Sequence, residues 1–120
     1  MSELSLLKDL SLLSKIIYKS CLLFPDDEKY NTISQIKRAV ISVRLNVREG
    51  NAFYDNRKRS QFERALGSLH EVDECMIIAN EMSWVNLNEF EKYREQYWLC
   101  LNKLKKLIHS LNSKNSGDKR

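Results

Sequence analysis

Apolar residues recur every three or four positions in four stretches of the chain, and this period predicts four amphipathic α-helices. The stretches cover about residues 3–24, 30–49, 57–82 and 87–111. The apolar residues that share one face of each stretch, which we expect in the core, are Leu6, Leu10, Leu13, Ile17, Cys21 and Phe24, then Ile33, Ile36, Val40, Val43 and Val47, then Phe62, Ala65, Leu66, Leu69, Val72, Met76 and Ala79, and last Phe90, Tyr93, Tyr97, Leu101, Leu104, Ile108 and Leu111.

Short breaks separate these stretches. Pro25 disfavours helix at the residue before it, and Asp27 can begin the next one. Gly50 predicts a left-handed helix end, and Asn86 is a candidate N-cap. Because short connections make neighbouring helices antiparallel, we predict an all-α fold, an up-down-up-down four-helix bundle over residues 1–111. Residues 112–120 are polar and are expected to form a disordered tail.

Two of the predicted helices carry a second apolar edge away from the core face. In the first helix this edge lies about 120° from the core face by the helical period. Edges of this kind favour a contact between subunits. The residues that we expect at such an interface are Leu12, Ile16, Leu23, Ile41 and Leu45.

The composition is that of a globular protein, with 42% hydrophobic and 30% charged residues. Gly and Pro are too scarce for a β-sandwich or barrel. No apolar run approaches the length of about 18 residues that a membrane span needs, and the first residues lack the basic start of a signal peptide. Three cysteines far apart, Cys21, Cys75 and Cys100, are typical of reduced thiols, so we expect a cytoplasmic protein.

Positive charge is concentrated in residues 29–64, where nine Lys and Arg stand against three acids. In the second helix Lys37, Arg44 and Arg48 fall within about 40° of one another. Phe53 and Tyr54 precede the basic run 57–59, and cations next to aromatic rings suit looped or single-stranded RNA. The nucleic-acid-binding residues that we predict are Lys37, Arg38, Arg44, Arg48, Arg57, Lys58, Arg59 and Arg64.

Two other interpretations of this basic surface stay open. It could be plain solvated surface, or it could pair with acids of another subunit. Glu63, Glu74 and Glu81 of the third helix, with His70, lie within about 40° and offer such acids.

Catalytic or metal-binding patterns are weak. His70 and His109 are far apart, neither follows a Glu by three residues, and there is no CxxC pair, phosphate-binding glycine loop or nucleotide fingerprint. Cys75 and His70 fall about 140° apart on their helix, so they do not form a nucleophile and base. We therefore expect neither an enzyme nor a bound metal or cofactor.

Two segments resemble a known family. They are the stretch 34–39, SQIKRA, followed by NVREG at 46–50, and the stretch 65–72, ALGSLHEV. Their order and spacing are similar to those of the four-helix-bundle proteins encoded in intervening sequences of bacterial large-subunit ribosomal RNA genes. That family in turn resembles the accessory proteins of diversity-generating retroelements. The resemblance implies a homopentamer with a basic surface in contact with nucleic acid, and it implies no enzyme.

The chain departs from the family pattern at Arg44, where the family has a proline within its second helix. Since proline kinks a helix, we expect this helix to be straighter here. Gly67 should cost about 1 kcal/mol in a helix interior, so we expect a neighbouring helix to approach it closely.

A protein adaptor is the alternative function. Trp98 and Leu99 turn away from the core stripe of the fourth helix and could anchor a partner such as a reverse transcriptase. Trp98 could instead fold over the edge of the bundle.

Overall fold

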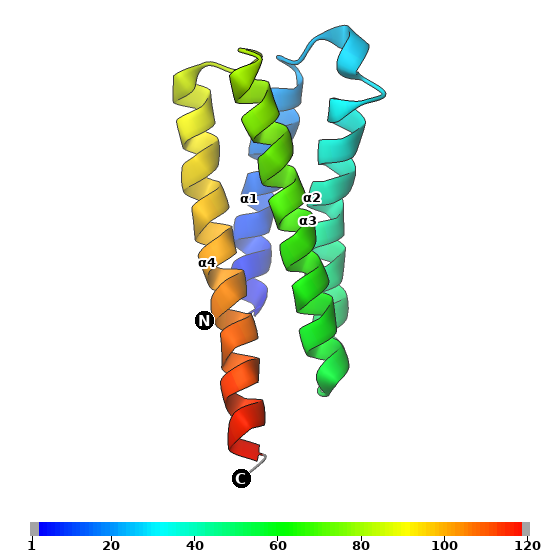
Figure 1. The fold of residues 1–120 in the computed structure, drawn as a ribbon, viewed down its shortest axis with the longest axis vertical. Helices are drawn as coiled ribbons and strands as arrows, with labels where there is room; N and C mark the ends of the chain where they lie inside the picture. The colour runs from blue at the N-terminus through cyan, green and yellow to red at the C-terminus, as the bar shows by residue number, and fades with distance from the viewer. Residues whose placement is uncertain (1–2, 119–120) are drawn as a thin grey trace.

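The computed structural model describes the backbone of residues 3–118 and the side chains of residues 3–111. Four α-helices make up the fold: α1 (Glu3–Cys21), α2 (Thr32–Asn51), α3 (Asn56–Glu81) and α4 (Leu87–Asp118). A short 3-10 helix, η1 (Asp26–Glu28), lies between α1 and α2. The helices alternate in direction, so the chain is an up-down-up-down bundle (Figure 1). The sequence prediction of an all-α four-helix bundle is therefore confirmed.

Each helix packs against two neighbours. α1 contacts α2 and α4, and α3 contacts the same two helices. The register of α1 against α4 shows their antiparallel direction, because Lys103 Nζ lies 2.8 Å from Ser5 Oγ whereas Gln96 Nε2 donates to the Asp9 carbonyl at 2.8 Å. α1 and α3 begin at the same end of the bundle, where Lys58 forms an ion pair with Glu3.

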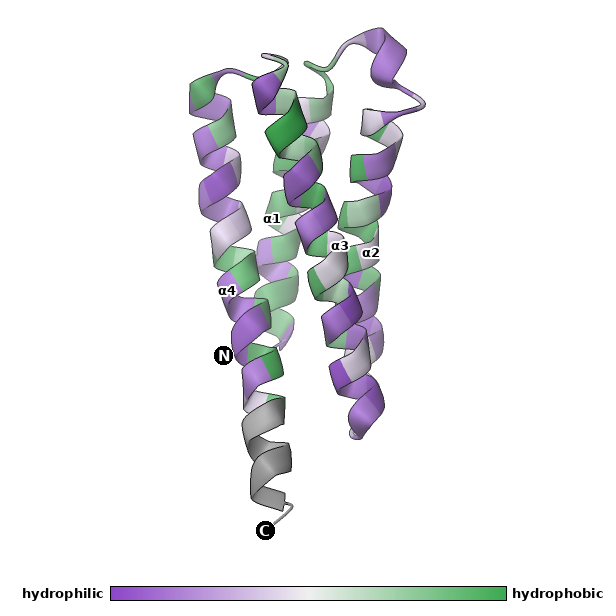
Figure 2. Cartoon of the chain, in the orientation of Figure 1, coloured by the Kyte–Doolittle hydropathy of each residue, from purple (hydrophilic) through white to green (hydrophobic). Residues whose placement is uncertain are grey.

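The core consists of the apolar faces that the period of the sequence predicts. Apolar residues gather on the sides of the helices that face one another, and α1 is the most hydrophobic helix (Figure 2). Fully buried side chains come from all four helices, among them Leu10, Val40, Leu69 and Tyr93. Ile33, Leu66, Phe90, Ile108 and Leu111 are only partly buried at the edge of this core.

The C-terminal ends of α1 and α2 differ from prediction. α1 ends at Cys21, so Leu23 and Phe24 belong to the turn before Pro25 rather than to the helix. α2 continues through Gly50 to Asn51, and no described glycine has a positive φ, so the left-handed stop expected at Gly50 is wrong.

Capping side chains fix the first residues of α3 and α4. Asn86 accepts a hydrogen bond from the backbone N–H of Glu89 at 2.8 Å, which confirms it as the N-cap of α4. Asp55 caps α3 through the N–H of Arg57 at 3.0 Å. The disordered tail expected over residues 112–120 falls on helical backbone as far as Asp118, with its side chains and residues 119–120 outside the described part.

Candidate nucleic-acid interface

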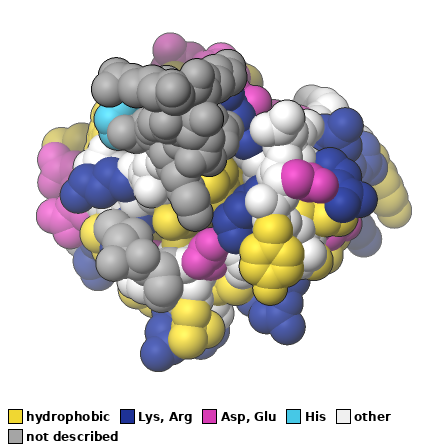
Figure 3. Space-filling model, turned by 90° about the horizontal axis from the view of Figure 1, so that it is seen from below, with side chains coloured by type: hydrophobic (Ala, Val, Ile, Leu, Met, Phe, Trp, Pro, Cys, Tyr) yellow, Lys and Arg dark blue, Asp and Glu magenta, His cyan; other side chains and the backbone are white. Residues whose placement is uncertain are grey.

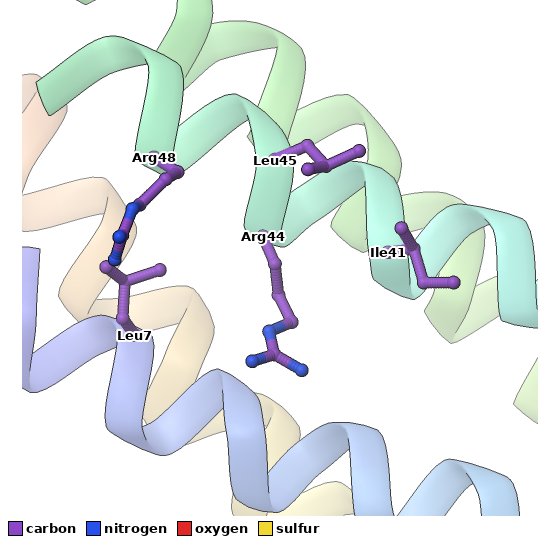
Figure 4. Close-up of a pocket in the computed structure, with 5 residues that line it drawn as sticks. All are labelled: Leu7, Ile41, Arg44, Leu45 and Arg48. Carbon is purple, nitrogen blue, oxygen red and sulfur yellow. The ribbon is translucent and has the colours of Figure 1, made fainter. Parts of the chain in front are cut away.

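A hollow of about 320 Å³ opens on the surface between α1 and α2, and we call it the α1/α2 groove. Its lining residues are Leu7 of α1 and Ile41, Arg44, Leu45 and Arg48 of α2. Figure 4 shows Arg44 and Arg48 extending from α2 toward α1, with Ile41 and Leu45 on the outer side of α2. The groove therefore combines two guanidinium groups with an apolar lining.

The helical period places these side chains. Val40, Val43 and Val47 of α2 point into the core with no exposed surface. Arg44 and Arg48 follow at one edge of that buried face, and α2 runs unbroken through Arg44. Neither arginine is within 4 Å of a carboxylate among the residues whose side chains are described, so both are free to bind an anion.

Lys37 extends the same row toward the other end of α2. Its ammonium lies 4.8 Å from the ring centroid of Tyr18 on α1. Because Leu7 meets α2 near Arg48 and Tyr18 meets it at Lys37, the row follows α1 for about 16 Å. The structure therefore brings Lys37, Arg44 and Arg48 together along one line between the two helices.

Three lysines on α1 add positive charge outside the row, and the sequence prediction missed them. Lys19 lines a hollow on the α4 side together with Glu89 and Glu95. Lys8, Lys15 and Lys19 are exposed and fall within about 40° of one another on the outer face of α1. None of them forms an ion pair with a described side chain. Their spacing of seven and four residues indicates a shared face of the helix. The sequence prediction was based instead on residues 29–64, where basic residues are more concentrated along the chain.

The basic run at the start of α3 behaves differently, because each of its members is paired. Arg57 forms an ion pair with Asp55 at 3.0 Å, Lys58 with Glu3 at 2.9 Å, and Arg59 with Glu63 at 3.8 Å. These pairs shift the pKa values of their members. The hydrogen bond from Lys58 lowers the pKa of Glu3, and the hydrogen bond from Arg57 lowers the pKa of Asp55. The hydrogen bond to Asp55 in turn raises the pKa of Arg57.

The aromatic residues of the α2–α3 loop also differ from each other. The Arg57 guanidinium lies 4.3 Å from the ring centroid of Phe53, so one face of that ring is occupied. Tyr54 is almost fully exposed. Seen from below, this end of the bundle carries Lys and Arg side chains around much of its rim, with hydrophobic side chains exposed between them (Figure 3).

Arg38 and Arg64 lie on another side of the bundle. Ser42 of α2 and Ser68 of α3 form a hydrogen bond of 2.9 Å between the two helices. Arg38 and Arg64 each precede one of these serines by four residues, so they lie on the α2/α3 side. Both are exposed, but the structure does not bring them to the α1/α2 groove.

The predicted interface residues do not lie together on one surface. Leu12 is 49% exposed on α1, and Ile16 lies on the side of α1 that faces α4. Ile41 and Leu45, 46% and 56% exposed, lie instead in the α1/α2 groove beside Arg44. Leu23, also about half exposed, lies in the turn beyond α1. The two apolar edges therefore do not form one surface.

The acidic stripe predicted on α3 is likewise divided. Glu63 pairs with Arg59, whereas Glu74 lines a separate hollow of about 470 Å³ between α2 and α3, together with Glu28 and Glu71. Cys75, Trp84 and Met82 contribute to the same hollow.

The described residues show little that resembles an active site. No three of their His, Cys, Asp or Glu side chains converge closely enough to hold a metal ion. Burial raises the pKa of the Cys21 thiol to about 11 and that of Cys100 to about 12, and it also raises the pKa of Cys75. These thiols are protonated at neutral pH and are therefore poor nucleophiles.

Trp98 is 45% exposed and lies along the edge of the bundle. Its ring meets that of Tyr97 edge-on at 5.6 Å, and the Arg94 guanidinium lies 5.4 Å from its centroid. Leu99 is exposed on the next position of α4. Among the described helices, none is both long and apolar enough to cross a bilayer.

The comparisons with known proteins agree with the resemblance in the sequence. Residues 2–110 match the family described as 23S rRNA-intervening sequence protein. No curated protein matches the chain. Because the match covers nearly the whole bundle, including α2 with its basic row and the α1 helix that faces it, the chain belongs to the 23S rRNA-intervening sequence protein family.

Proposed function

We propose that this protein is a non-enzymatic, oligomeric bundle that binds nucleic acid, RNA above all, through the basic surface of α1 and α2. One observation carries the proposal: Lys37, Arg44 and Arg48 form a row that no described acid neutralises. Lys8 and Lys15 add further exposed positive charge on the outer face of α1. An array of free cations of this kind is suited to phosphates, and it favours binding with little preference for sequence.

The pairing pattern argues against plain solvation as the whole explanation. The cations at the start of α3 form ion pairs with acids, whereas Arg44 and Arg48 of the α1/α2 groove form none with the side chains of residues 3–111. Unpaired like charges on neighbouring helices repel one another, so an anionic partner would relieve a cost that the free protein carries.

Assembly would strengthen a weak site. We propose that the apolar edge of Leu12 and Ile16 joins copies of the chain, with a homopentamer favoured by the family resemblance. Several basic rows in one particle bind a long polyanion at high effective concentration.

The test is a salt series. Lys37→Gln/Arg44→Gln/Arg48→Gln should lower the slope of log K against log salt by about 2 units on single-stranded RNA, since each phosphate neutralised contributes about 0.7. The matched control is Lys92→Gln/Lys105→Gln/Lys106→Gln, which removes the same charge from α4 and should change the slope little. Binding of a labelled RNA is measured by fluorescence anisotropy.

Two results would contradict the proposal. If the α2 variant stays assembled and keeps the wild-type slope, the row is not the site. If it dissociates into monomers, the arginines pair with acids of another copy instead.

A protein adaptor remains the second candidate, and the half-exposed Trp98 favours it. An apolar contact with a protein partner would be nearly insensitive to salt, whereas the binding of RNA weakens steeply.

A further inference from the structure

We infer that the α1/α2 groove binds an unpaired nucleotide, so the protein prefers single-stranded nucleic acid to a duplex. The inference rests on the proposed function and specifies the ligand of the same surface. It rests on the composition of the groove, in which two free arginines stand beside an aliphatic lining, and on the shape of the groove as a hollow rather than a flat face.

The two parts of a nucleotide match the two parts of the groove. Arg44 and Arg48 present planar guanidinium groups, which bind phosphate oxygens in pairs. Leu7, Ile41 and Leu45 offer apolar surface to the flat face of a base, which loses contact with water when it is covered. A volume of about 320 Å³ is at the lower end of small-ligand pockets and suits one nucleotide rather than a larger ligand.

A duplex cannot use the groove in this way. Its bases are stacked and paired inside, and a helix presents phosphates and sugars to a protein surface. A duplex could therefore contact the arginines and the α1 lysines but would leave the aliphatic lining uncovered. An unpaired base can leave the stack and enter the groove, as in most sequence-specific RNA recognition.

The length of the row also fits a single strand. From Arg48 to Lys37 the row of cations follows α1 for about 16 Å, so it can contact more than one phosphate of the same strand. At the Lys37 end, Tyr18 is exposed beneath the ammonium group and provides an aromatic face for a further base.

The exposure of Ile41 and Leu45 then has a reason other than a contact between subunits. Both lie within the groove with the arginines, whereas Ile16 lines the separate hollow between α1 and α4. We therefore assign Ile41 and Leu45 to the bound base.

The experiment compares a labelled single-stranded RNA with a blunt-ended RNA duplex of the same number of phosphates. The wild-type protein should bind the single strand about tenfold more tightly, the scale of one favourable base contact. Ile41→Gln/Leu45→Gln should abolish this preference while leaving the salt slope unchanged, because no charge is altered. The matched control is Met82→Gln/Leu87→Gln, which changes two equally exposed apolar residues at the α3–α4 connection and should keep the preference.

Each other outcome decides against the inference in a distinct way. Equal binding of single strand and duplex with a normal salt slope leaves the proposed function intact and overturns the nucleotide site. Retention of the preference in the Ile41 and Leu45 variant places the base elsewhere. Dissociation of that variant into monomers, seen by light scattering, assigns the groove to a second copy of the chain. Absence of binding to either RNA overturns the proposed function itself.

Discussion

The carboxylate of Asp73 joins α3 to α4 by accepting hydrogen bonds from two side chains of α4. The Tyr93 hydroxyl donates to Oδ1 at 2.7 Å, and the Arg94 guanidinium donates to both oxygens at 2.8 and 3.0 Å. Tyr93 is fully buried, and this burial raises the pKa of its hydroxyl well above the ordinary value. The phenol therefore remains a donor throughout the physiological range.

Substitutions at this site should have unequal effects on stability. Tyr93→Phe removes one donor and leaves Asp73 paired with Arg94, so we expect a loss of about 1 kcal/mol in the free energy of unfolding. Asp73→Ala leaves a buried hydroxyl and a guanidinium without an acceptor and should cost about 1–3 kcal/mol. Urea unfolding measures both, and an Asp73→Ala variant as stable as Tyr93→Phe would contradict the assignment.

The ion pair of Glu3 and Lys58 should make stability depend on pH in the acid range. The folded pKa of Glu3 lies below the unfolded value near 4.5, because Lys58 stabilises the carboxylate. The stabilisation is therefore present above the unfolded pKa and is lost as pH falls through the folded pKa. Both side chains are partly exposed, so we expect no more than about 1 kcal/mol at neutral pH.

Glu3→Gln tests this pair. The difference from wild type in the free energy of unfolding should be largest at neutral pH and should shrink toward zero as pH falls through the lowered pKa of folded Glu3. Lys58→Gln should show the same pH dependence. A constant difference across this range would mean that the ion pair does not contribute.

At the scale of single residues, the sequence predicted the cations but not their partners. Lys58 and Glu3 lie far apart in the chain and meet only because α1 and α3 start at the same end of the bundle. The interaction between Asp73 and Arg94 also joins two helices. Pairs of this kind depend on the packing of helices, which periodicity within one helix does not describe.

At the scale of helices, the surroundings of Gly50 in α2 differ from those of Gly67 in α3. A Cβ added to Gly50 would lie 2.6 Å from Cε1 of Phe62, whose ring is fully buried. A Cβ added to Gly67 would meet nothing within 4 Å, so the close helix contact expected there is wrong. The sequence predicted a helix end at Gly50 and a costly helix position at Gly67, but only the packing shows that Gly50 is the glycine that is required.

The two glycines therefore predict opposite mutational effects. Gly67→Ala should stabilise the protein by up to about 1 kcal/mol, because it improves helix propensity without a clash. Gly50→Ala should destabilise it by about 1–3 kcal/mol, because the Phe62 ring must move. Thermal unfolding of the two variants checks this, and a stabilising Gly50→Ala would show that the ring has room to shift.

The periods of the helices and the N-cap of α4 were predictable because they are local properties. Leu6, Leu10 and Leu13 are fully buried as their spacing required, and Asn86 caps α4. The α1/α2 groove was not predictable, since it arises where Leu7 of one helix meets Arg44 and Arg48 of another. The sequence placed both arginines on one stripe, but it did not show that Ile41 and Leu45 share their hollow.

At the scale of the whole molecule, the α1/α2 groove lies on one side of α1, and the predicted apolar edge that includes Ile16 reaches the side that faces α4. An assembly through that edge leaves every α1/α2 groove open. The assembly then presents several weak sites in one particle, and a long strand that reaches more than one of them dissociates slowly. A short strand can occupy one groove only and gains nothing from assembly.

This difference gives a prediction that separates assembly from binding. Leu12→Gln/Ile16→Gln should convert the oligomer, about 71 kDa if five chains of 14.2 kDa assemble, into a monomer. The monomer should bind a short single strand as well as the wild type does, because its groove is unchanged. Its affinity for a long strand should fall by a factor of about 10² or more, as multivalent binding is lost.

Light scattering gives the mass, and anisotropy with RNAs of two lengths gives the affinities. Ile41→Gln/Leu45→Gln provides the reciprocal control, since it should remain assembled. A Leu12 and Ile16 variant that also loses the short strand has a damaged fold, which circular dichroism would detect. A folded monomer that keeps the wild-type affinity for the long strand would show that each groove acts alone and that assembly serves another purpose.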